Sequence, residues 1–231
     1  MTKGLQITGA SKYYNEGLNR IAALDNVSLN VEPGEFIAVV GPSGSGKSTF
    51  LSVAGALLKA SEGAVMLNGQ DVSKLSDNQL SDIRLHEVGF IMQASNLVPY
   101  LNVLDQLLVV KRMSGKVSEA DKDFAVKLLE ELGLGTKLKS YPEELSGGEK
   151  QRTAIARALI NDPNVILADE PTASLDTKRA HEVVSLIAHE VRTRQKAAIM
   201  VTHDERLLAY CDKVYRMEDG KLSLAKVESI H

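Results

Sequence analysis

Apolar positions along this chain form two kinds of pattern. Four short runs are almost continuously apolar and β-branched, which is typical of parallel strands buried on both faces. Segments with helical spacing of their apolar residues separate these runs. Strands that alternate with helices predict an α/β domain built on a parallel sheet. The four runs cover residues 36–40, 88–92, 165–168 and 197–201, and the helical segments cover about 50–58, 76–84 and 177–194.

The N-terminal part of the chain carries signals of antiparallel strands. Residues 5–7 and 24–31 have strand patterns, and the polar segment 11–17 lies between them. Residues 64–72 contain Asn68-Gly69, a dipeptide typical of tight hairpin turns. A last hairpin is expected at 213–225, around Asp219-Gly220. We therefore predict an antiparallel β subdomain beside the parallel sheet.

Residues 94–162 differ from the rest because their pattern is helical throughout. Helices are expected at 103–113, 118–132 and 149–161. The second of these begins with a capping box at Ser118, and Gly133 follows its end. We predict one domain over residues 1–231, with a core of 1–93 and 163–231 and an inserted helical subdomain at 94–162.

Composition narrows the class of protein. The 231 residues carry a formal net charge of −3 and are 44% hydrophobic. A chain with this net charge lacks the excess of Lys and Arg that is typical of nucleic-acid-binding proteins, so we expect no nucleic-acid partner. Cys211 is the single cysteine, which suits a reducing compartment. The chain lacks an apolar signal core and any run near the ~18–20 apolar residues of a membrane span. We expect a cytosolic protein that can dock on a membrane protein.

One motif organises the chain, directly after the first apolar run. It matches the phosphate-binding pattern G-x-x-x-x-G-K-[ST], placed between a strand and a helix. Glycines let backbone N–H groups approach phosphate oxygens, and the helix N-terminus adds partial positive charge. Lys47 is expected on the β- and γ-phosphates and Ser48 on Mg²⁺. The motif comprises Gly41, Pro42, Ser43, Gly44, Ser45, Gly46, Lys47, Ser48 and Thr49.

Two further segments carry candidate chemistry. The apolar run 165–168 ends in Asp169 and Glu170, at the strand end where α/β sheets bind ligands. Asp169 is a candidate Mg²⁺ ligand, and Glu170 is a candidate base for an attacking water. The sequence from Leu145 to Arg152 begins a helix with a serine cap and two glycines, a second place where backbone N–H groups can bind an anion.

The sequence Leu-Ser-Gly-Gly-Glu-Lys-Gln-Arg at 145–152 resembles the signature motif of ATP-binding cassette (ABC) ATPases. Its order, after the phosphate loop and before the acidic strand, also matches that family, and the resemblance covers nearly the whole chain. It implies a P-loop NTPase (RecA-like) core with ATP and Mg²⁺ as cofactors. The matching site residues are Tyr14, Gln93, Ser146, Gly147, Gly148, Glu149, Asp169, Glu170, Asp176 and His203.

Each matching residue takes a role from the family. Tyr14 is the residue expected to stack on adenine. The adjacent Tyr13 is the alternative for this role. Gln93 would complete the Mg²⁺ sphere, and His203 would contact the γ-phosphate. The resemblance also implies a head-to-tail homodimer, in which the 145–151 motif of one chain completes the phosphate loop of the other. Asp176 ends the D-loop, which matches residues 174–176.

Several functions share these motifs. We favour the ATPase subunit of an ABC transporter that powers a separate membrane permease, on the cytoplasmic face of the membrane. A non-transport ABC ATPase, such as an iron–sulfur assembly ATPase, is the alternative. A DNA-repair type usually carries a longer insertion than 94–162, and a translation type carries two cassettes. A P-loop kinase or GTPase would not need the 145–152 motif, and a nucleotide sensor would not need Glu170 and His203.

Two short stretches point to a branch of the transporter family. Residues 16–20 and 94–103 resemble the macrolide-export and lipoprotein-release branch, and the second stretch is most similar to haem-efflux ATPases. This resemblance implies efflux of a haem, peptide, drug or lipoprotein type of cargo. The segment 97–110 is rich in Leu and Val, and either packs within the helical insertion or helps to grip a permease helix.

Overall fold

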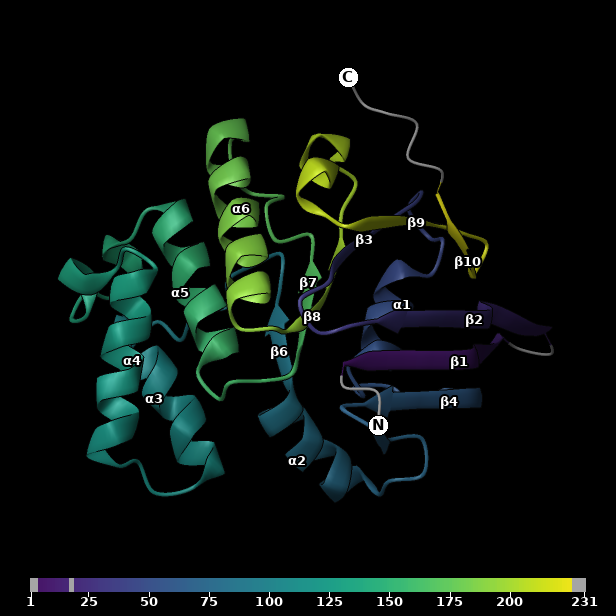
Figure 1. The fold of residues 1–231 in the computed structure, drawn as a ribbon, viewed down its shortest axis with the longest axis horizontal. Coiled ribbons are helices and arrows are strands. Elements are labelled where there is room, and N and C mark those ends of the chain that lie inside the picture. The colour runs from purple at the N-terminus through teal and green to yellow at the C-terminus, as the bar shows by residue number, and fades with distance from the viewer. Residues whose placement is uncertain (1–3, 17–18, 226–231) are drawn as a thin grey trace.

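A computed structural model describes residues 4–16 and 19–225 of the chain, and its centre is a mostly parallel sheet of six strands (Figure 1). The strand order is β10-β9-β3-β8-β7-β6, with β10 antiparallel to β9 and the other neighbours parallel. The strands are β3 (Phe36–Val40), β6 (Val88–Ile91), β7 (Val165–Asp169), β8 (Ala197–Val201), β9 (Lys213–Glu218) and β10 (Lys221–Leu224). The four apolar runs therefore form the adjacent strands β3, β8, β7 and β6, as predicted.

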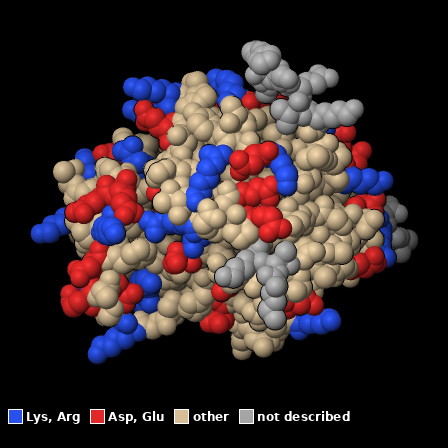
Figure 2. Space-filling view, in the orientation of Figure 1, with Lys and Arg blue, Asp and Glu red and all other residues tan. Residues whose placement is uncertain are grey.

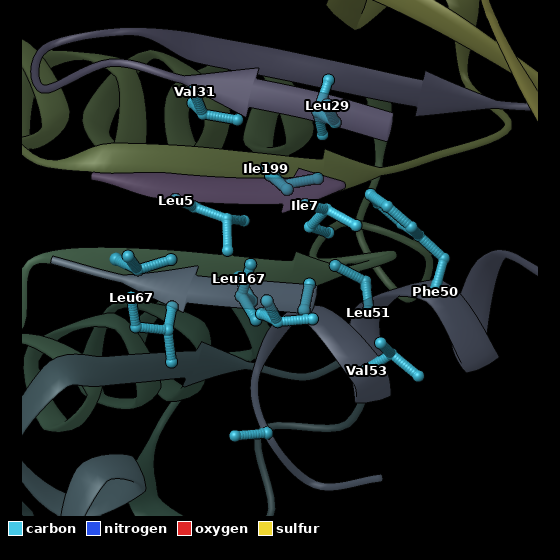
Figure 3. Close-up of a cluster of buried hydrophobic side chains, with 14 of the residues drawn as sticks. Leu5, Ile7, Leu29, Val31, Phe50, Leu51, Val53, Leu67, Leu167 and Ile199 are labelled. Atoms are coloured by element: carbon cyan, nitrogen blue, oxygen red, sulfur yellow. The ribbon is translucent and has the colours of Figure 1, made fainter. Parts of the chain in front are cut away.

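Both faces of the parallel sheet are covered, which explains why its strands are continuously apolar. Side chains alternate along a strand, so Ile37, Leu167 and Ile199 enter one apolar cluster. Figure 3 shows this cluster, in which Leu167 and Ile199 meet Phe50 and Leu51 of α1 (Lys47–Ala54). Ile166 and Met200 point to the opposite face and pack in a second cluster with the helices there.

A four-stranded antiparallel sheet lies over α1, with the order β2-β1-β4-β5. Its strands are β1 (Leu5–Glu16), β2 (Asn19–Val31), β4 (Glu62–Leu67) and β5 (Gln70–Asp71). The predicted polar segment at 11–17 between two short strands is wrong, because its described residues belong to the long β1. Register shifts interrupt the β1–β2 pairing between Ile7 and Tyr13. Such bulges break the period-two pattern, so the strand was not visible in the sequence.

The helices begin where capping residues place them. Ser76 and Ser118 form capping boxes at α2 (Asp77–Glu87) and α4 (Glu119–Glu131), and Asn102 caps α3 (Val103–Ser114). Ser146 caps α5 (Gly147–Leu159), which therefore begins two residues before the predicted 149. Asp176 caps α6 (Thr177–Thr193). The helix predicted at 50–58 is instead α1, which begins at Lys47 and ends at Ala54.

The segment 94–162 contains α3, α4, α5 and the 3-10 turns η1 (Gly135–Lys137) and η2 (Pro142–Glu144). Its three helices stand at one side of the molecule, next to α6 (Figure 1). They share one apolar cluster with α6 and with the sheet, so the segment has no separate core among the described residues. The boundaries at 94 and 162 stay a prediction. No helix in the described ranges is both long enough and apolar enough to span a bilayer.

Candidate active site

The phosphate loop connects β3 to α1 and is folded around its own lysine. The Lys47 ammonium donates hydrogen bonds to the carbonyl oxygens of Gly41 and Pro42, at 2.8 and 2.7 Å. Gly46 precedes α1 with a left-handed φ of 104° and accepts a hydrogen bond from Phe50 N. The first N–H groups of α1 have no partners within the helix, so they can bind phosphate oxygens.

Two glycines of the loop are required by close packing. A Cβ atom on Gly41 would lie 2.1 Å from the Met217 carbonyl oxygen, and a Cβ on Gly46 would lie 2.3 Å from the Ala23 carbonyl oxygen. Both glycines also have positive φ, which side chains disfavour. In addition, Gly220 N donates a hydrogen bond of 3.0 Å to Ser45 O. The loop is thus held against β2 and the β9–β10 turn.

A cavity of about 400 Å³ opens in front of the loop and gathers most of the predicted site. Three separate segments of the sequence meet there: the phosphate loop, Gln93 after β6, and the acidic pair after β7. The lining residues are Ala23, Ser43, Gly44, Gly46, Lys47, Ser48, Thr49, Gln93, Asp169, Glu170 and Val201.

Ala23 and Val201 line this cavity but were missing from the sequence prediction. Val201 ends β8, and the carboxyl end of a parallel strand is a signal that could have identified it. Ala23 comes from the antiparallel sheet, whose approach to the phosphate loop leaves no mark in the sequence. Gly41, Pro42 and Ser45 of the predicted set lie in the loop without lining the cavity.

The acidic pair lines the same cavity as Lys47. Burial raises the pKa of the Asp169 carboxyl, the charge of Glu170 raises it further, and Lys47 partly opposes both effects. Glu170 has a φ of 46°, an uncommon backbone conformation for a non-glycine residue. Its N–H is held by the Val201 carbonyl at 2.9 Å. A strained residue that is fixed by its neighbours is typical of an active site.

His203 lies next to Glu170, although the two are 33 positions apart in the sequence. The His203 Nδ1 atom is 2.9 Å from Glu170 Oε2, and 72% of the histidine side chain is exposed. When Nδ1–H donates to the carboxylate, Nε2 stays free to meet a ligand. The structure therefore brings the predicted base and the predicted phosphate sensor together at the edge of the cavity.

The segment around Gln93 is attached to α5. Gln151 Nε2 donates to the Met92 carbonyl at 3.3 Å. Arg157 donates to the carbonyls of Ser95 and Asn96 at 2.7 and 2.8 Å. Since α5 begins with the 146–149 motif, a single helix connects that motif to the segment that carries Gln93 into the cavity.

The remaining predicted residues lie outside the cavity of this chain. Ser146 and Glu149 cap α5 reciprocally: Glu149 N donates to Ser146 Oγ, and Ser146 N donates to a Glu149 carboxylate oxygen at 2.8 Å. These hydrogen bonds lower the pKa of Glu149, which also lies 3.5 Å from Lys137. Gly147 and Gly148 form the first turn above that cap, and Asp176 accepts from Arg179 N at the start of α6.

The two candidate tyrosines have different environments. The Arg20 guanidinium lies 3.5 Å from the centre of the Tyr13 ring, and the Tyr13 hydroxyl contacts Glu62. Tyr14 is 43% exposed, and Lys12 Nζ lies 5.7 Å from the centre of its ring. Tyr14 is therefore the better placed of the two to stack on a base.

Taken together, these groups can bind a triphosphate and activate water next to it. The loop and α1 offer N–H donors and an ammonium to the phosphates, and hard oxygen donors lie opposite them. The Glu170 carboxylate, oriented by His203, can accept a proton from a water molecule. The site is built for hydrolysis of a nucleoside triphosphate.

Comparisons with known proteins agree with this geometry. The family model described as "ABC transporter" matches residues 24–173. A putative hemin import ATP-binding protein HrtA from Staphylococcus aureus (strain MRSA252) is 46% identical over 214 residues, or 92% of this chain and 96% of the relative. The HrtA protein of Staphylococcus haemolyticus (strain JCSC1435) is 46% identical over 220 residues, or 95% and 99%.

Solved structures show the same fold. The dimeric structure of MJ0796, a bacterial ABC transporter cassette, is similar with a TM-score of 0.86 at 35% identity, and covers 97% of this chain and 99% of that chain. The cassette cbiO1 from Clostridium perfringens, part of the ABC transporter complex cbiONQ, matches with a TM-score of 0.86 at 26% identity, over 97% and 88%. With its sequence, its fold and its phosphate cavity in agreement, this chain belongs to the ATP-binding proteins of ABC transporters, which hydrolyse ATP to power transport.

Proposed function

We propose that this chain binds MgATP in the cavity and hydrolyses it with Glu170 as the base. Lys47 and the phosphate loop hold the β- and γ-phosphates, and Tyr14 stacks on the adenine. Glu170 accepts a proton from the attacking water, while His203 orients Glu170 and contacts the γ-phosphate. The observation that carries this proposal is the meeting of Lys47, Asp169 and Glu170 in one cavity.

Magnesium suits the donor atoms present. Ser48, Gln93 and Asp169 supply a hydroxyl, an amide oxygen and a carboxylate, which are the hard oxygen ligands that Mg²⁺ takes. Among the described residues, no cluster of three carboxylate, imidazole or thiol groups forms a complete metal cage. A site with one carboxylate fits an ion that shares its remaining positions with phosphates and water. Bound Mg²⁺ would neutralise charge on the triphosphate.

The test of this proposal is the substitution Glu170→Gln. The amide cannot accept the proton of water, so steady-state ATP hydrolysis should fall about 10²–10⁴-fold while nucleotide binding persists. A matched control is Glu182→Gln, an exposed residue of α6. Phosphate release and the titration of a fluorescent ATP analogue measure the two quantities. Hydrolysis within a few-fold of the unchanged protein would reject Glu170 as the base.

The second part of the proposal is a head-to-tail homodimer. The Ser146 helix start lies outside the cavity of its own chain, so it is free to meet the phosphates bound by another chain. The similar MJ0796 cassette is described as dimeric, including a post-hydrolysis state bound to ADP and Pi. ATP would favour the closed dimer because its phosphates contact both chains, and hydrolysis would weaken that contact.

The third part is a separate membrane permease on which the dimer docks, at the cytoplasmic face of the membrane. A groove of about 180 Å³ lies between α2, β6, α3 and α5, and is lined by apolar residues such as Phe90 and Val110 together with Arg84 and Arg157. Beside it, the buried Gln106 holds the backbone at Val98 and Leu101 through three hydrogen bonds. This ordered loop presents Tyr100, which is 80% exposed.

Nucleic acid is not part of this proposal. On the face shown in Figure 2, basic and acidic side chains of the described residues are interspersed, without a continuous basic stripe in view. Protein–DNA interfaces are much more positively charged than this.

The cargo we propose is haem, moved outward. The HrtA relatives carry the description "putative hemin import ATP-binding protein", whereas residues 16–20 and 94–103 resemble an export branch. Within the first stretch, Gly17 and Leu18 lie outside the described residues, and the second stretch forms the loop before α3. In the complex with its permease, hemin should stimulate ATP hydrolysis several-fold. Stimulation by peptides and not by hemin would contradict a haem cargo.

A further inference from the structure

Arg206 holds the loop that follows His203 through several hydrogen bonds. Arg206 forms two side-chain hydrogen bonds with the Asp204 carboxylate, at 2.8 and 2.7 Å, and its N–H adds a third at 3.1 Å. Asp204 N in turn donates to Thr202 Oγ1 at 3.0 Å. The pairing with Arg206 lowers the pKa of Asp204. The residues on both sides of His203 are therefore joined by hydrogen bonds.

The same arginine connects this loop to another element. Arg206 Nη1 donates to Thr177 Oγ1 at 3.1 Å. Thr177 is the first residue of α6 and directly follows Asp176, the cap of that helix. Figure 1 shows α6 beside the 3-10 turn η3 (Glu205–Tyr210), which begins next to Asp204.

The segment that leads into α6 and the first turn of that helix also approach the start of α5. A Cβ atom built on Gly147 would lie 3.5 Å from Leu175 Cδ2, and one on Gly148 would lie 3.8 Å from Arg179 Cδ. The side chains of Leu175 and Arg179 thus lie beside the two glycines that begin α5, and Gly147 stays exposed. Arg206 thus contacts Thr177, whose chain neighbours Leu175 and Arg179 lie beside the glycine motif, and it follows His203 by three residues.

We propose that Arg206 is a positioning residue that transmits the state of the His203 loop to the glycine start of α5 through Thr177. This inference rests on the proposed function, in which His203 meets ATP in its own chain and the glycine start meets ATP in the partner. In the dimer, Arg206 then couples the two ATP sites through one chain. A guanidinium suits this role because its planar fork binds Asp204 twice and keeps one N–H for Thr177.

The coupling is tested by a double-mutant cycle on ATP hydrolysis. We expect Arg206→Ala and Thr177→Val each to lower kcat about 3–10-fold and to reduce the Hill coefficient for ATP toward 1, with KM changed less than about twofold. The double variant should be no slower than Arg206→Ala alone, because both changes remove the same contact. Arg206→Lys should recover only part of kcat, since an ammonium lacks the fork. Arg112→Ala is the control, because this arginine on α3 is exposed and, among the described residues, its side chain pairs with Asp105 alone.

The outcomes separate this inference from the proposed function. Additive losses in the double variant, or an unchanged Hill coefficient in Arg206→Ala, would overturn the coupling role. If either of these results were found and Glu170→Gln were inactive, only the inference about Arg206 would fail. If Glu170→Gln stayed active, the proposed function itself would fail. Thermal unfolding of each variant checks folding, and since Arg206 and Thr177 are exposed, we expect little change there.

Discussion

At the scale of single residues, the environment of each side chain decides whether it acts on a ligand or supports the fold. Glu170 combines a left-handed backbone, a fixed N–H and a histidine on its carboxylate, all of which prepare it for chemistry. Glu149 carries the same functional group but caps its own helix. Both glutamates match motif residues of the family, and the geometry shows how their surroundings differ.

Cys211, in contrast to Glu170, has a side chain whose surroundings make it less reactive. Burial, and then the negative charge of Asp212, raise the pKa of the Cys211 thiol to about 12, while Arg192 partly opposes them. The thiolate is the nucleophile, so the folded protein should hold Cys211 as the protonated thiol between pH 7 and 9.

We therefore predict slow alkylation of Cys211 in the folded protein. At pH 8, a maleimide or disulfide reagent should modify the native chain at least tenfold more slowly than the chain in urea, where the thiol has an ordinary pKa. The rate should rise as pH increases toward the raised pKa. Equal rates in the native and unfolded protein would show that the thiol is exposed and ordinary.

At the scale of elements, α5 is the helix that connects the parts of the site. Its N-terminus carries the glycine motif, Gln151 in its middle holds Met92, and Arg157 near its end holds Ser95 and Asn96. Burial lowers the pKa of Arg157, but a guanidinium stays charged, and two carbonyl oxygens satisfy it. The segment after Gln93 is thus fixed by charge-assisted hydrogen bonds.

Replacing Arg157 should loosen that segment. Arg157→Ala leaves the carbonyls of Ser95 and Asn96 without this donor, so we expect a loss of about 1–3 kcal/mol in unfolding free energy. Urea denaturation measures it, with Arg112→Ala as the exposed control. A loss equal to that of the control would mean that water replaces the guanidinium without cost.

The sequence predicts elements well where one physical rule dominates. The strands of the parallel sheet were visible because burial on both faces makes them continuously apolar, and the start of α4 was visible because a serine caps it. The β1–β2 hairpin was missed because bulges shift its register. Ala23 and Arg206 were missed for another reason: their roles depend on contacts between distant segments, and neither residue type marks such a contact.

At the scale of the whole molecule, the proposed function divides the ATP site between two places on the chain. The phosphate loop and the acidic pair line one cavity, and His203 pairs with Glu170, while Ser146, Gly147 and Gly148 lie outside the cavity. Both halves are anion-binding helix starts, so each is suited to the same triphosphate. A second copy of the chain, related by a two-fold axis, would supply each cavity with the missing half.

The most direct test of this account is the mass of the Glu170→Gln variant in solution, measured by light scattering with and without MgATP. Because this variant binds ATP without hydrolysing it, the account predicts a monomer without nucleotide and a dimer with MgATP. Adding Ser146→Arg to the same variant should abolish the dimer by placing a bulky side chain at the helix start. A protein that stays monomeric with saturating MgATP at high concentration would contradict the shared site.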